Sequence, residues 1–208
     1  MLQYMNDGGI IMWIIAALSA AATAIAVERF LFFRQYGTDA EELEKKLGEA
    51  IKKGNFEEAN AIAASSNSSL NRLFAAALAK WRAAPQQMEL LLNQQIRREI
   101  FRWEKHLYIM ELIGKTAPLL GLLGTVLGMV EMFGSLHTGG QINAAAVTGG
   151  IWKALYTTVA GLAAAIPIIF VYGLLNSLID NEDETLKRGA DFITRLRMDY
   201  TDEKTQQN

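Results

Sequence analysis

Three hydroxyl side chains could do chemistry within the long apolar stretches of this sequence: Thr125, Thr157 and Thr158. A hydroxyl can donate a hydrogen bond to an ionised carboxylate and accept one from a protonated carboxyl group, so it can solvate both states of a proton carrier. The alternative is that each threonine bonds to the carbonyl four residues back in its own helix and only packs there. Packing is the better interpretation of any one threonine alone, whereas hydroxyls at one depth beside a row of glycines favour a polar-lined helix interface.

The apolar stretches carry no carboxylate at their centres. No Asp or Glu lies between Lys115 and Glu131, or between Lys153 and Asp180. Proton movement through the centre of a bilayer needs a titratable group or a chain of water molecules there. If this chain conducts protons, another component must therefore supply the carboxylate.

A row of glycines lies at helical spacing in the stretch from 116 to 129: Gly121, Gly124 and Gly128. Steps of three and four residues place them on one helix face, together with Thr125. In a soluble helix each glycine would cost roughly 1 kcal/mol relative to alanine. In a membrane, helices pack through small residues that let their backbones approach closely. The stretch therefore predicts a close-packed membrane helix, and Gly161 offers a similar contact site on the facing stretch.

The two apolar stretches predict a helical hairpin centred roughly on residue 142, so positions whose numbers add up to about 284 should lie at similar depth. Thr125 then pairs with Thr158 near mid-membrane, and Glu131 pairs with Lys153 near the outer edge. Opposite charges at one depth would offset part of each other's desolvation. The alternative is that both charged side chains reach the outer interface independently.

The composition fits apolar membrane segments joined to charged soluble ones: of 208 residues, 51% are hydrophobic and 20% are charged. The net charge of −2 gives no indication of nucleic-acid binding. The absence of cysteine excludes disulfides, thiol catalysis and thiolate metal sites, and the two histidines, His106 and His137, lie far apart in sequence. We therefore expect no metal, no cofactor and no enzymatic activity.

Three apolar runs divide the chain. We expect an N-terminal segment with the first transmembrane helix at 1–34, a cytoplasmic helical domain at 35–109, a second transmembrane helix at 110–135, a short periplasmic loop at 136–149, a third transmembrane helix at 150–179 and a cytoplasmic tail at 180–208. The proposed outer segments contain no Lys or Arg, which predicts a periplasmic N-terminus and a cytoplasmic C-terminus. A cleaved signal peptide is the alternative for the first run, but the basic residues follow that run instead of preceding it.

Apolar residues repeat every three to four positions from Ile96 to Gly128. This period predicts one long helix that leaves the cytoplasmic domain and continues into the membrane, with a kink at Pro118; Pro167 predicts a second kink in the third span. The expected fold class is an all-α membrane protein with three transmembrane helices, from which long helices extend into a cytoplasmic helical domain. In that domain and the tail, two apolar stripes are expected: Leu43, Leu47, Ala50 and Ile51, then Leu186, Phe192, Ile193 and Leu196.

Two segments resemble a known family: TAPLLGLLGTVLGM at 116–129 and GIWKALYTTVAGLAAAIP at 150–167. They are similar to the ExbB/TolQ family, closest to ExbB, which is distantly related to the MotA flagellar stator subunits. The resemblance implies a homo-oligomer, a pentamer, around a dimer of an ExbD-like protein whose single membrane helix carries a proton-binding aspartate. It also implies that Thr125 and Thr158 line the pore. Lys153 departs from the family motif, which usually has Glu there, so the relay role of that Glu is not carried over.

Such a complex would use the proton motive force across the bacterial inner membrane to energise TonB-dependent outer-membrane transport through a TonB-like protein. The function expected from the resemblance is that of the proton-conducting subunit, a multi-pass protein in contact with membrane lipid. Two alternatives stay open. One is a TolQ-like subunit for envelope maintenance, and the other is a non-conducting membrane scaffold whose threonines only pack.

Overall fold

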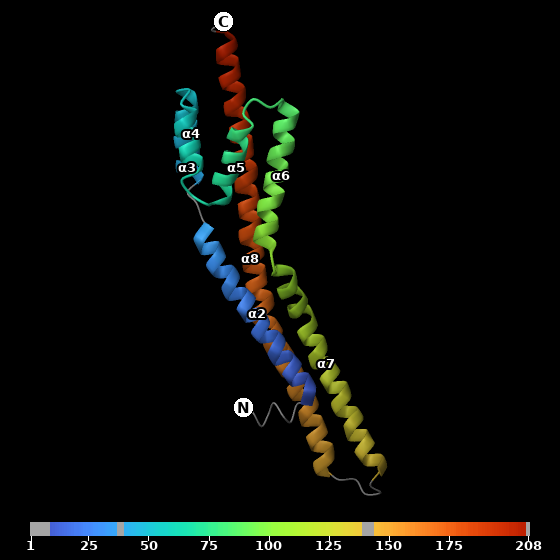
Figure 1. Cartoon of the computed structure of the whole chain (residues 1–208). Coiled ribbons are helices and arrows are strands. Elements are labelled where there is room, and N and C mark those ends of the chain that lie inside the picture. Colours follow the sequence, from blue (N-terminus) through green and yellow to red (C-terminus); the bar gives the residue numbers. More distant parts are fainter. Residues whose placement is uncertain (1–8, 37–39, 139–143, 207–208) are drawn as a thin grey trace. The chain divides into compact units, whose positions relative to one another are not determined.

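The computed structural model describes residues 9–36, 40–138 and 144–206, and within these ranges the chain forms helices joined by short turns, without a strand. Figure 1 shows their order: α2 (Gly9–Tyr36), α3 (Ala40–Lys52), α4 (Phe56–Ala63), α5 (Ser69–Ala79), α6 (Pro85–Glu104), α7 (Leu107–Thr138) and α8 (Ala144–Gln206). Three of these helices are long and apolar enough to cross a membrane, over Gly9–Arg34, Leu107–Gly134 and Val147–Thr201. The expected fold class, an all-α membrane protein with three spans, is confirmed.

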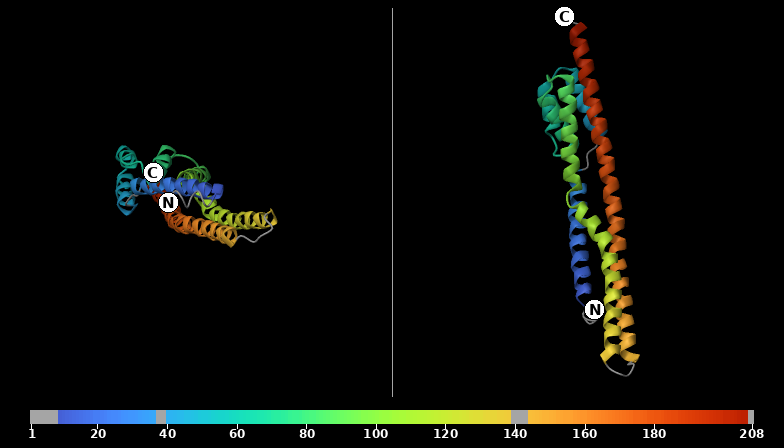
Figure 2. Two further views of the ribbon diagram at one scale, coloured as in Figure 1. Left: turned by 90° about the horizontal axis from the view of Figure 1, so that it is seen from below. Right: turned by 90° about the vertical axis from the view of Figure 1, so that its right-hand side faces the viewer.

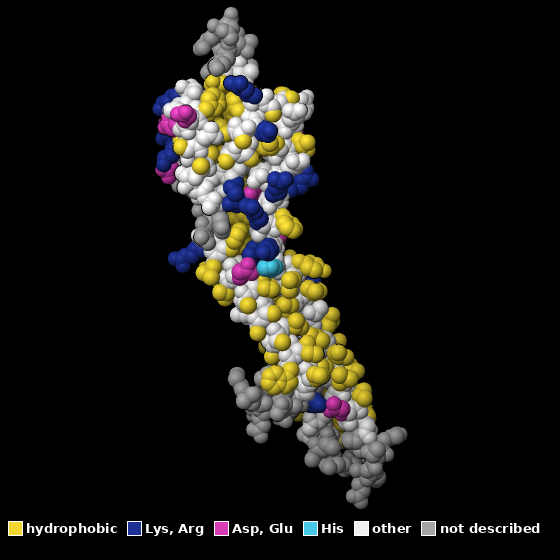
Figure 3. Space-filling view, in the orientation of Figure 1, with side chains coloured by type: hydrophobic (Ala, Val, Ile, Leu, Met, Phe, Trp, Pro, Cys, Tyr) yellow, Lys and Arg dark blue, Asp and Glu magenta, His cyan; other side chains and the backbone are white. Residues whose placement is uncertain are grey.

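The first compact unit contains the chain up to Arg29 and His106–Leu175, which is the apolar part of α2 with α7 and the first part of α8. Helices α7 and α8 lie side by side and antiparallel in every view (Figures 1 and 2). Large apolar side chains remain on the outside of this unit, as Figure 3 shows, and Phe170 is 68% exposed. Helices that are apolar on all sides are typical of membrane spans, because lipid or neighbouring subunits cover them.

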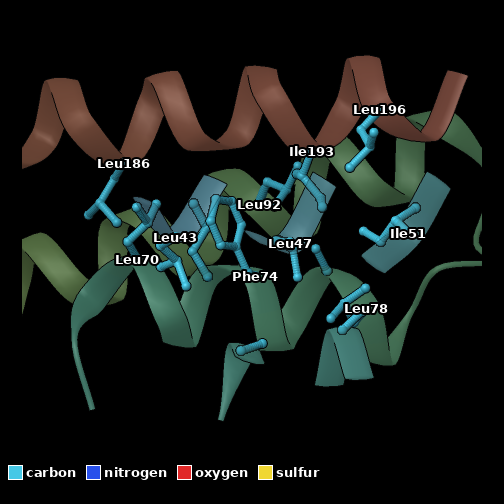
Figure 4. Close-up of a cluster of buried hydrophobic side chains, with 14 of the residues drawn as sticks. Leu43, Leu47, Ile51, Leu70, Phe74, Leu78, Leu92, Leu186, Ile193 and Leu196 are labelled. Atoms are coloured by element: carbon cyan, nitrogen blue, oxygen red, sulfur yellow. The ribbon is translucent and has the colours of Figure 1, made fainter. Parts of the chain in front are cut away.

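The second compact unit contains Phe30–Lys105 and the chain from Asn176 onward, and it has a packed apolar core. Both predicted stripes contribute to this core, except that Phe192 only packs against its edge. Figure 4 shows how side chains from α3, α5, α6 and α8 meet there: Leu43, Leu47, Ile51, Leu70, Phe74, Leu78, Leu92, Leu186, Ile193 and Leu196. Local caps define the helix starts, since the Ser68 hydroxyl accepts from the Asn71 amide at 3.1 Å.

The prediction of one continuous helix from Ile96 into the membrane is wrong. Helix α6 ends at Glu104, α7 begins at Leu107, and His106 between them has a φ of 67°, in the left-handed region that ends a right-handed helix. The His106 carbonyl accepts from the amides of Ile109 and Met110, so it starts the new helix. Apolar spacing cannot reveal this break, because Trp103, Leu107 and Met110 keep helical spacing across it. At the break, His106 Nδ1 lies 2.9 Å from Glu28 Oε2 of α2.

The third apolar run and the charged tail form one helix, because α8 continues without interruption from Ala144 to Gln206. Pro118 and Pro167 lie inside α7 and α8, and neither proline ends its helix. The domain boundaries and the membrane sides assigned from the sequence stay predictions.

Candidate functional site

The contact between α7 and α8 is a seam of glycines, and its closest point joins Gly121 to Gly161. A Cβ atom at Gly161 would lie 2.6 Å from the Ala117 carbonyl oxygen and 3.0 Å from the Gly121 Cα. A Cβ atom at Gly121 would lie 2.9 Å from the Thr157 carbonyl oxygen and 3.1 Å from the Thr158 Cα. Only glycine fits both positions, because the atoms in the way belong to the facing backbone.

The seam continues from this point toward the loop between the two helices. At Gly124 a Cβ atom would overlap the side chain of Thr157, and at Gly128 it would lie 3.2 Å from the Cβ of Ala154. A Cβ atom at Gly150, on α8, would lie 2.8 Å from the Cβ of Met132. The glycines that the sequence assigned to helix packing therefore all lie at close helix contacts within this chain.

The three candidate hydroxyls differ in burial and in hydrogen bonding. Thr157 is fully buried, and its Oγ1 donates to the Ala154 carbonyl at 2.8 Å. Thr125 and Thr158 are half-buried; Thr125 Oγ1 donates to the Leu122 carbonyl at 2.6 Å, and Thr158 Oγ1 lies 3.3 Å from the Gly121 carbonyl across the seam. Thr125 and Thr157 thus bond to carbonyls three residues back in their own helices, close to the four-residue spacing of the packing alternative, whereas Thr158 bonds across the seam. Each hydroxyl oxygen keeps the capacity to accept a hydrogen bond.

The structure brings Glu131 and Lys153 together near the loop end of the hairpin. Lys153 Nζ donates to Glu131 Oε2 at 2.7 Å, with the lysine side chain 28% and the glutamate side chain 63% exposed. The lysine also lies close to Gly9 at the start of α2. One chain is therefore sufficient to form the pair.

The contacts among charged groups near the start of α7 were not predicted from the sequence. Glu28 Oε1 accepts from Arg29 Nη2 at 2.7 Å, and Glu28 Oε2 meets His106. The second compact unit also holds a buried carboxylate, Glu99, bound to Arg72. The only sequence signal for Glu99 is its position three residues after Ile96, on the apolar face of its helix. In the described part of the chain, no three His, Cys, Asp or Glu side chains are grouped so that they could hold a metal ion.

A glycine seam between two long apolar helices, with hydroxyls beside it and large apolar side chains outside, defines a multi-pass helical membrane protein. The chain belongs to the MotA/TolQ/ExbB proton channel family, whose model matches residues 65–188. The family predicted from the two motifs is therefore confirmed. It is a group of proton channels and not a class of enzymes.

Individual relatives agree with this assignment. The chain is 31% identical over 176 residues to the biopolymer transport protein ExbB-like 3 of Synechocystis sp., a match that covers 82% of each protein. It is 41% identical over 88 residues to the biopolymer transport protein exbB1 of Vibrio cholerae, which covers 42% of this chain and 39% of that one. Among solved structures, C. jejuni MotAB has a similar fold, with a TM-score of 0.67 and 14% identity over 93% of this chain and 80% of the other.

Proposed function

We propose that this chain is the proton-conducting subunit of an inner-membrane motor that energises TonB-dependent outer-membrane transport. The observation that supports this function is the α7–α8 seam, where the half-buried hydroxyls of Thr125 and Thr158 lie in spans without a central carboxylate. An ExbD-like partner with one span would supply the missing acid as a membrane aspartate. The motor subunit itself would catalyse no covalent reaction.

The hydroxyls suit a partner acid that alternates between two protonation states. In this chain each hydroxyl proton points to a backbone carbonyl, at Leu122 for Thr125 and at Gly121 for Thr158. A protonated aspartic acid can donate to the hydroxyl oxygen without disturbing that bond. An ionised aspartate needs a hydrogen-bond donor, so the threonine hydroxyl must rotate away from the backbone carbonyl that it bonds. That carbonyl keeps the hydrogen bond that it accepts from its own helix.

The assembly that follows from this function is a homopentamer around a dimer of the partner, in contact with lipid and with a TonB-like protein. The exposed apolar side chains of α7 and α8 supply surface for such contacts, since one copy of the chain leaves them uncovered. Because the cargo is set by partners, identifying the single-span protein that copurifies with this chain separates the TonB role from a TolQ-like role.

The test of conduction is Thr158→Val, which keeps the shape of the side chain and removes its hydrogen bonds. In a complex with the native partner, this variant should assemble normally and lose proton-driven transport, measured as proton uptake into proteoliposomes. The matched control is Thr23→Val, because Thr23 lies in the first span and bonds only to Ser19 of its own helix. Full proton uptake by Thr158→Val would contradict the proposed path, and a loss of assembly would favour the scaffold alternative.

A further inference from the structure

Helix α7 carries an ion pair within the first turns of its apolar span, Leu107–Gly134. Glu111 Oε1 accepts from Lys115 Nζ at 2.5 Å, with the glutamate side chain 30% and the lysine side chain 70% exposed. On a soluble helix, a pair of this kind contributes little to stability. Within a membrane span, ionisable side chains are rare and mark the paths of ions and protons. The place of Glu111 relative to the candidate hydroxyls decides between these two interpretations.

Glu111 lies on the same face of α7 as Thr125. The two residues are 14 positions apart (125 − 111), which is about four helical turns and about 21 Å along the helix axis. On α8, Tyr172 has the same relation to Thr158, again 14 positions away (172 − 158). Each helix therefore presents polar groups on one face at two levels, first a hydroxyl and then, toward the start of α7, a carboxylate or a phenol.

Glu111 and Tyr172 lie at one level of the hairpin. A Cβ atom at Gly114 would lie 2.9 Å from Ile169 Cγ1, so α7 and α8 still pack closely at this end. The residue numbers of Gly114 and Ile169 add up to 283, and so do those of Glu111 and Tyr172 and those of the two half-buried threonines. In an antiparallel hairpin, positions with the same sum lie at the same level. The Tyr172 side chain accordingly makes a hydrogen bond with the Glu111 carboxylate.

The two polar levels are separated by apolar side chains. The stretches between them, 116–124 on α7 and 159–171 on α8, contain one polar side chain, Thr116. It lies on the opposite side of α7 from Thr125, and its hydroxyl donates to the Leu112 carbonyl at 2.8 Å. A proton that leaves the level of the candidate hydroxyls in this direction therefore meets no titratable side chain of either helix before it reaches the level of Glu111.

We propose that Glu111 is the proton acceptor at the inner end of the proton path. This inference rests on the proposed function, because the path begins at the partner acid beside Thr125 and Thr158. The partner's carboxylic acid releases its proton to water, the Glu111 carboxylate binds that proton, and it then returns the proton to the cytoplasmic water. Lys115 offsets the cost of keeping a charged carboxylate within the span. The exposed part of the Glu111 side chain leaves the carboxylate open to water.

The test measures proton flux through proteoliposomes that contain the chain and its native partner, at low and at high buffer concentration on the cytoplasmic side. Glu111→Gln should assemble normally and lose flux several-fold at low buffer. High buffer should restore the flux, because a mobile buffer can replace a fixed proton acceptor. Glu111→Asp should keep most of the flux. The matched control Glu184→Gln removes an exposed carboxylate elsewhere on α8 and should change nothing.

A double variant separates proton transfer from a merely structural ion pair. Glu111→Gln with Lys115→Gln removes both charges, so neither is left without its partner. A structural pair predicts that the double variant recovers the flux lost in Glu111→Gln, and this result would overturn the inference. Proton transfer predicts that the flux of the double variant stays low and depends on buffer.

The failure of this inference can be distinguished from the failure of the proposed function. A wild-type complex without proton flux, or full flux in Thr158→Val, would refute the proposed function. A conducting wild-type complex whose flux is unchanged in Glu111→Gln, or is lowered there and not restored by buffer, would overturn the role of Glu111 alone.

Discussion

Replacing Gly161 by alanine should destabilise the α7–α8 pair, because a Cβ atom has no space at that position. It would lie 2.6 Å from the Ala117 carbonyl oxygen and 3.0 Å from the Gly121 Cα. Non-bonded carbon atoms prefer separations of about 3.5–4.0 Å. Both obstructing atoms belong to the backbone, so no side chain can rotate away, and the two helices must move apart along the seam.

The expected cost follows from the size of this overlap. Forcing an extra carbon atom into a packed interface costs about 1–3 kcal/mol, which is roughly 5- to 150-fold in the unfolding equilibrium constant. Alanine also favours a helix over glycine by about 1 kcal/mol, and this gain opposes the loss. Gly173→Ala is the matched control, because a Cβ atom there meets nothing within 4 Å in this chain and α8 carries both positions. The difference between the two variants isolates the overlap.

Gly124→Ala should also be destabilising. Its Cβ atom would lie 2.6 Å from the Cβ and 3.0 Å from the Cγ2 of Thr157. Rotation of the Thr157 side chain moves its Cγ2 but not its Cβ, so it cannot relieve the closer of these two contacts. Adding Thr157→Gly removes the side chain that is in the way, so the double variant should be less destabilised than the sum of the single variants.

The assay is unfolding of the purified chain in mixed micelles with increasing SDS, followed by tryptophan fluorescence. The midpoints of Gly124→Ala and Gly161→Ala should both lie below that of Gly173→Ala. If Gly161→Ala unfolds at the same SDS fraction as Gly173→Ala, the seam is not as close as the structure shows. If Thr157→Gly adds to Gly124→Ala without any coupling, the overlap with Thr157 is not what limits position 124.

Two further predictions concern the Glu131–Lys153 pair and the topology. Glu131→Gln and Lys153→Met should each lower stability or transport, because each single change leaves one charge of the 2.7 Å pair without its partner. The double variant should be less impaired than the sum of the two single variants. Strict additivity would mean that the pair contributes nothing. In cells with a permeabilised outer membrane, an impermeant thiol reagent should label Gly134→Cys and not Thr201→Cys, and the reverse pattern would refute the assigned orientation.

Much of the fold could be predicted because it depends on patterns within single helices. Long charge-free runs predict spans, and the stripe at Leu43 and Leu47 predicts which face of α3 enters the core. The break at His106 could not be predicted in this way. The apolar rhythm continues through Trp103, Leu107 and Met110, all of which are buried, while the break is a single residue, His106, with a positive φ.

The same distinction applies to the candidate site. Glycines at steps of three and four residues identify a close-packed face before any partner is known. The facing residues Thr157 and Gly161 lie on the stretch that the hairpin arithmetic places opposite this face. The ion pair between Arg72 and Glu99 leaves almost no such pattern. The two residues are 27 positions apart, and only the packing of α5 against α6 brings them together.

Thr157 and Thr158 are adjacent in sequence, yet their positions around the helix separate their roles. One residue along a helix is a rotation of about 100°, which turns Thr157 fully into the seam and leaves Thr158 at its edge. Thr157 fills the space beside Gly124, so it sets how closely α7 and α8 approach. Thr158 reaches the Gly121 carbonyl but stays half-buried, which leaves its oxygen accessible to the proposed partner acid. Stability should therefore depend on Thr157, and proton transfer on Thr158.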